Sequence, residues 1–90
     1  MDSWTKLKNL YIKDHESKDF LVSPKTRLYA MSRIDELFQR SFPHIIKQPK
    51  LLNQIPKDQF MVEVQTKKGS DLTGSEKSVI NGIYKFLKYL

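Results

Sequence analysis

The residue types best suited to chemistry in this sequence lie in its last eighteen positions, where lysines are interleaved with tyrosines and an asparagine. Four of them recur at three- and four-residue steps and would share one helix face: Lys77, Asn81, Tyr84 and Lys88. Lys85 and Tyr89 lie beside that face. Ammonium groups pair with phosphates, while amides and flat rings hydrogen-bond to bases or stack on them. The pattern favours a nucleic-acid-binding surface, although an ordinary solvated lysine face has the same composition.

Cations elsewhere in the chain could enlarge that surface. The formal net charge is +6, and the segment 40–68 is the most positive stretch. A charge of this sign favours anionic partners, either nucleic acid or an acidic protein surface. The predicted nucleic-acid-binding residues are therefore Lys77, Asn81, Tyr84, Lys85, Lys88, Lys67, Lys68, Lys47 and Lys50. No helix-turn-helix, zinc-finger, RNP or KH motif accompanies them.

The segment 42–56 supports a different hypothesis, which is docking to another protein. Prolines at positions 43, 49 and 56 hold this segment in irregular backbone, and it is rich in large apolar side chains. Those side chains are Phe42, Ile45, Ile46, Leu51, Leu52 and Ile55. If exposed, they would form the interface of an inhibitor or adaptor. If folded inward, they would close over the core as a lid.

Catalytic and metal-binding chemistry has little support in the sequence. The chain has no cysteine, and its two histidines, His15 and His44, stand in no motif that would position a nucleophile. The acidic stretch around Asp14 and Glu16 matches neither zinc nor calcium spacing. The three glycines are too scattered to form a phosphate-binding loop. We expect no enzymatic activity, no catalytic residues, no metal and no cofactor.

Composition indicates the class of protein and its compartment. Ninety residues with 39% hydrophobic and 29% charged positions suit one small globular domain spanning 1–90. No apolar run approaches the length of a membrane span, and the first residues lack a signal-peptide layout. We therefore expect a cytoplasmic protein. A single alanine beside abundant lysine, leucine and isoleucine is what an AT-rich coding sequence produces, as in phages and mobile elements.

Apolar periodicity predicts two helices in the first half of the chain. The first spans about 3–13 and the second about 24–41. Ser23 followed by Pro24 is a strong start signal for the second helix, because serine caps the free amides and proline fits the first turn. Pro43 ends it.

A third helix over about 75–90 would carry the lysines and tyrosines of the chain's last residues. Thr73 and Glu76 have the spacing of a capping box at its start, and Ser75 is the rival cap. One stripe of this helix is apolar and would face the core, while the lysine stripe would face solvent.

Two short strands complete the predicted fold, over 20–22 and 59–66. In the second, Phe60, Val62 and Val64 alternate with polar residues, as in a half-buried strand. The predicted class is α+β, mostly α, with three helices packed on a two-stranded element; an all-α small bundle is the alternative.

The function predicted from the sequence is that of a small basic non-enzymatic binding protein. It would be an accessory or regulatory factor that contacts nucleic acid or a complex that handles it. The alternative is a protein-interaction module that docks through 42–56.

Overall fold

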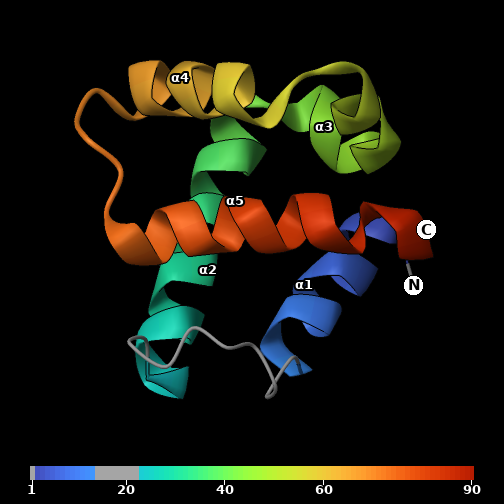
Figure 1. The fold of residues 1–90 in the computed structure, drawn as a ribbon, viewed down its shortest axis with the longest axis horizontal. Coiled ribbons are helices and arrows are strands. Elements are labelled where there is room, and N and C mark those ends of the chain that lie inside the picture. The colour runs from blue at the N-terminus through green and yellow to red at the C-terminus, as the bar shows by residue number, and fades with distance from the viewer. Residues whose placement is uncertain (1, 14–22) are drawn as a thin grey trace.

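Helices make up most of the part of the chain that the structure describes (Figure 1). The computed structural model describes residues 2–13 and 23–90. Within these ranges the elements are α1 (Ser3–Lys13), α2 (Pro24–Ser41), α3 (Pro43–Lys47), the 3-10 helix η1 (Pro49–Gln54), α4 (Lys57–Lys68), α5 (Gly74–Phe86) and the 3-10 helix η2 (Leu87–Tyr89). No strand occurs in the described ranges. None of the helices found there is long and apolar enough to cross a membrane.

Three other helices pack against α5. It runs across α2, with α4 on one side and α1 on the other (Figure 1). The first turns of α1 lie beside η2, where Lys6 Nζ donates a hydrogen bond to the Tyr89 carbonyl at 2.9 Å. This packing buries most of the α5 surface and determines which of its side chains reach solvent.

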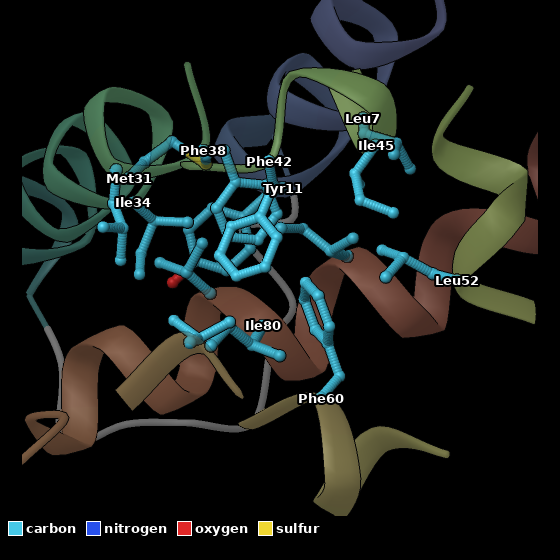
Figure 2. Close-up of a cluster of buried hydrophobic side chains, with 14 of the residues drawn as sticks. Leu7, Tyr11, Met31, Ile34, Phe38, Phe42, Ile45, Leu52, Phe60 and Ile80 are labelled. Carbon is cyan, nitrogen blue, oxygen red and sulfur yellow. The ribbon is translucent and has the colours of Figure 1, made fainter. Parts of the chain in front are cut away.

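A cluster of aromatic rings joins the helices around α2. Trp4 stacks on Phe38 with ring centroids 5.1 Å apart, and Phe60 meets Phe38 edge-on at 5.6 Å. Phe42, between α2 and α3, contacts both Phe38 and Phe60. Figure 2 shows aliphatic side chains of the same cluster, among them Leu7, Ile34, Ile45 and Ile80. Ring contacts of this kind contribute about 0.5–1.5 kcal/mol each beyond their burial, so they tie α1 and α4 to α2.

The helices predicted over 3–13 and 24–41 are confirmed. Ser23 caps α2 as expected, because its side-chain oxygen accepts a hydrogen bond from the Thr26 amide at 3.2 Å. The helix predicted over 75–90 differs slightly, since α5 begins at Gly74 and changes to the 3-10 geometry of η2 after Phe86.

The strand predicted over 59–66 is wrong, because these residues belong to α4. Val62 is 66% exposed, whereas Phe60 and Val64 are buried. Phe60 and Val64 are four residues apart and so share the inner face of a helix. Gly69 then ends α4 with φ of 80°, the left-handed conformation that glycine adopts at helix C-termini.

Because residues 59–66 are helical, the predicted α+β class is wrong as well. The other predicted strand, 20–22, lies outside the described residues. The part of the chain that the structure describes is a compact, all-helical globule, and the two-stranded element is not seen in it.

Candidate nucleic-acid interface

A capping box begins α5 and ties it to neighbouring helices. Thr73 Oγ1 accepts a hydrogen bond from the Glu76 amide at 3.1 Å, and Glu76 Oε1 accepts one from the Thr73 amide at 2.9 Å. Thr73 is therefore the cap, and Ser75 lies in the first turn. Glu76 is 1% exposed as a residue. Lys68 Nζ donates a hydrogen bond to its Oε1 at 2.6 Å, and Arg33 Nε lies 3.7 Å from its Oε2.

The pairing of Glu76 removes a negative charge from the α5 surface. Burial alone would raise the pKa of Glu76, but hydrogen bonds from Lys68 and Thr73 outweigh it and hold the pKa below the usual 4.5. Glu76 is the sole carboxylate side chain in the sequence 74–90. The surface of α5 and η2 therefore carries no acidic side chain of its own, and Lys68 is committed to a structural pair.

One narrow face of α5 and η2 remains in solvent. We call its exposed polar side chains the lysine face: Lys77, Asn81, Lys85 and Lys88. At a rise of about 1.5 Å per residue, this face extends about 17 Å from end to end. Lys85 Nζ lies 5.3 Å from the ring centroid of Phe86, and Lys88 Nζ lies the same distance from that of Tyr89.

Tyr84 is oriented differently from the lysines that share its stripe in the sequence. Its hydroxyl donates a hydrogen bond to the Ile55 carbonyl at 2.8 Å, and its ring lies 6.2 Å from that of Phe60. Burial, with a contribution from the nearby Glu63 carboxylate, raises the pKa of Tyr84 to about 12. Tyr84 thus fastens α5 to the segment before α4, and the structure does not place it with the lysine face.

The other predicted lysines are divided between the side of the molecule where α5 begins and the side where the chain ends (Figure 1). Lys67 is exposed in the last turn of α4, on the side of the molecule where α5 begins (Figure 1). Lys47 and Lys50 are exposed and line a cleft of about 410 Å³ together with Leu90. We call this hollow the basic cleft. Because η1 packs against η2, the basic cleft adjoins the Lys88 end of the lysine face.

Some polar residues of this region were not predicted from the sequence. Gln48 and Gln54 line the basic cleft, and so does Ser3 of α1. Lys6, one turn further along α1, is held against the Tyr89 carbonyl. Packing of α1 on α3 brings these residues together across a long stretch of chain, so no local sequence signal marks them.

The apolar residues proposed for protein docking lie largely inside the molecule. Phe42, Ile45 and Leu52 are 5%, 0% and 0% exposed. The other three are half-buried against the core: Ile46, Leu51 and Ile55. Segment 42–56 thus forms a lid over the aromatic cluster, and little of its apolar surface faces outward.

Comparison of the chain with known protein families, curated proteins and solved structures found no match. Among residues 2–13 and 23–90, no three histidine or carboxylate side chains gather where they could hold a metal ion. The chemistry of the exposed surface is therefore the basis for assigning a function.

Proposed function

We propose that this protein is a small basic, non-enzymatic binding protein whose lysine face contacts the phosphates of nucleic acid. The observation that carries the proposal is the separation of charge on α5. Lys77, Lys85 and Lys88 lie at the surface, whereas Glu76 is buried against Lys68. A phosphate backbone would meet these ammonium groups without repulsion from a carboxylate on the same helix.

Binding is favoured over catalysis on chemical grounds. The chain has no cysteine, and no motif in it positions a serine or histidine for nucleophilic attack. A protein of this kind would act as an accessory or regulatory factor, alone or within a complex that handles nucleic acid.

The test is a binding titration with a labelled oligonucleotide in increasing salt. Three to five phosphate contacts predict a log–log salt slope of about −2.7 to −4.5 on duplex DNA, so affinity should fall steeply between about 50 and 200 mM. The variant Lys85→Glu/Lys88→Glu should lose binding at every salt concentration, because it reverses the charge at one end of the lysine face.

A matched control separates the lysine face from net charge. Lys13→Glu/Lys25→Glu changes the net charge by the same amount at exposed positions where α1 ends and α2 begins, away from η2 (Figure 1). This variant should keep most of the affinity. The proposal would be refuted if both variants lost affinity equally, or if the unaltered protein did not bind the oligonucleotide at low salt. Circular dichroism of each variant shows whether the helices are retained.

A further inference from the structure

Tyr89 is an exposed ring at the end of the lysine face. It is 53% exposed, and its centroid lies 6.0 Å from that of Phe86, which is buried. Lys88 Nζ is 5.3 Å from the Tyr89 ring, and Lys85 Nζ is equally close to Phe86. A ring supported on one side and open to solvent can accept a base, while the ammonium groups beside it pair with the flanking phosphates.

The basic cleft continues this surface beyond η2. Lys47 and Lys50 supply positive charge, and the side-chain amides of Gln48 and Gln54 offer both donors and acceptors. No aspartate or glutamate of the described residues lines the cleft. A chain of phosphates that crosses the lysine face would therefore meet further cations there, together with amides that can bond to sugars or base edges.

The shape of the surface distinguishes an unpaired strand from a duplex. A helix that reads duplex DNA projects into a major groove about 12 Å wide, but α5 is enclosed by α1, α2 and α4 and exposes one stripe. In a duplex the bases are also stacked on one another, so none is free to lie on Tyr89. Both features fit a flexible strand whose bases are unpaired.

We propose that the lysine face, Tyr89 and the basic cleft together bind single-stranded nucleic acid, with a base stacked on Tyr89. The phosphates on either side of that base pair with the lysines of the lysine face and with Lys47 and Lys50. This inference rests on the nucleic-acid-binding function proposed above and specifies its partner as an unpaired strand.

The test compares affinities for a labelled strand of about 16 nucleotides, offered as DNA and as RNA, with the affinity for the matched duplex. The strand should bind more tightly in at least one of the two forms. Tyr89→Ala should weaken strand binding about 5- to 150-fold, the range expected for loss of one stacked base. Tyr89→Phe should bind like the unaltered protein. Tyr29→Ala is the matched control, because Tyr29 is 59% exposed near the start of α2, and α2 begins on the side of the molecule opposite η2 (Figure 1).

A second variant tests the basic cleft without relying on Tyr89. Lys47→Gln/Lys50→Gln should reduce the log–log salt slope for the strand by about 1.4, which corresponds to two lost phosphate contacts. A duplex that binds at least as tightly as the strand, with no effect of Tyr89→Ala, overturns this inference and leaves the proposed function in place. If neither strand nor duplex binds at low salt, the proposed function fails and this inference fails with it.

Discussion

Gly82 of α5 packs directly against the ring of Tyr11 of α1. A Cβ atom at position 82 would lie 2.5 Å from Tyr11 Cδ2, well inside van der Waals contact. The ring is itself held in place, because the Arg27 guanidinium lies 4.5 Å from its centroid and Ser78 Oγ lies 3.5 Å from its hydroxyl. The missing side chain at position 82 therefore lets α1 approach α5, and this contact helps determine which face of α5 stays in solvent.

Gly82→Ala should lower the free energy of unfolding. Alanine favours a helix by about 1 kcal/mol over glycine, but overpacking against Tyr11 costs about 1–3 kcal/mol, so a net loss is expected. Gly74→Ala is the control, because nothing lies within 4 Å of a Cβ atom there. Urea titrations followed by circular dichroism measure both variants. A gain in stability for Gly82→Ala would contradict the close approach of α1 to α5.

Glu76→Gln should destabilise the protein at neutral pH by about 1.5–3 kcal/mol, because the substitution removes the buried carboxylate that pairs with Lys68. The pKa of Glu76 is lowered in the fold, so its stabilising contribution is present above about pH 4.5 and is lost as pH falls through the folded-state pKa. The difference in unfolding free energy between the variant and the unaltered protein should therefore narrow in acid. Glu36→Gln, at an exposed position, is the control and should change the unfolding free energy at neutral pH far less. A pH-independent difference would argue against the charged pair.

Tyr84→Phe should reduce stability by about 0.5–1.5 kcal/mol, because the Ile55 carbonyl loses its donor. Nucleic-acid affinity should remain unchanged, in contrast to Lys85→Glu/Lys88→Glu. The pKa of Tyr84 is raised to about 12 in the fold. Its contribution to the free energy of unfolding is therefore fully present below pH 10.0 and is lost as the pH rises through about 12. Ultraviolet titration of the unaltered protein should show a late phenol ionisation that is lost in the variant. If Tyr84→Phe bound nucleic acid more weakly than the unaltered protein, Tyr84 would belong to the nucleic-acid interface after all.

Leu52→Ala should cost about 2–5 kcal/mol of stability, because Leu52 is 0% exposed and alanine would leave a cavity beneath the lid. Leu51→Ala is the neighbouring control and should cost much less, since Leu51 is half-buried. Thermal unfolding measures both changes. If Leu52→Ala left the melting temperature unchanged, the lid would not be part of the core.

Local signals in the sequence were sufficient to predict the boundaries of α1 and α2 and the capping box at the start of α5. Ser23 and Thr73 each bond to an amide three residues later, so the information that specifies these caps lies within one turn. The exposure of Lys77, Lys85 and Lys88 also follows from helical periodicity alone.

Periodicity was not sufficient where two patterns fit the same residues. Phe60, Val62 and Val64 read equally well as a strand face, and packing of Phe60 on Phe38 and Phe42 in a helical register decided between them. Tyr84 lay on the lysine stripe by sequence spacing, but the carbonyl that fixes its hydroxyl belongs to Ile55, far away in the chain. Contacts between residues far apart in the sequence cannot be predicted from the pattern of neighbouring residues.

The sequence by itself determined the basic charge, the amphipathic character of the last helix and the caps that start two of the helices, because each depends on residues within a few positions of one another. Only the tertiary structure decided that Glu76 is buried against Lys68, that segment 42–56 closes the core, and that Lys47 and Lys50 adjoin η2. These relationships depend on which helices pack together, and packing is decided by the shapes of side chains that meet across long stretches of chain.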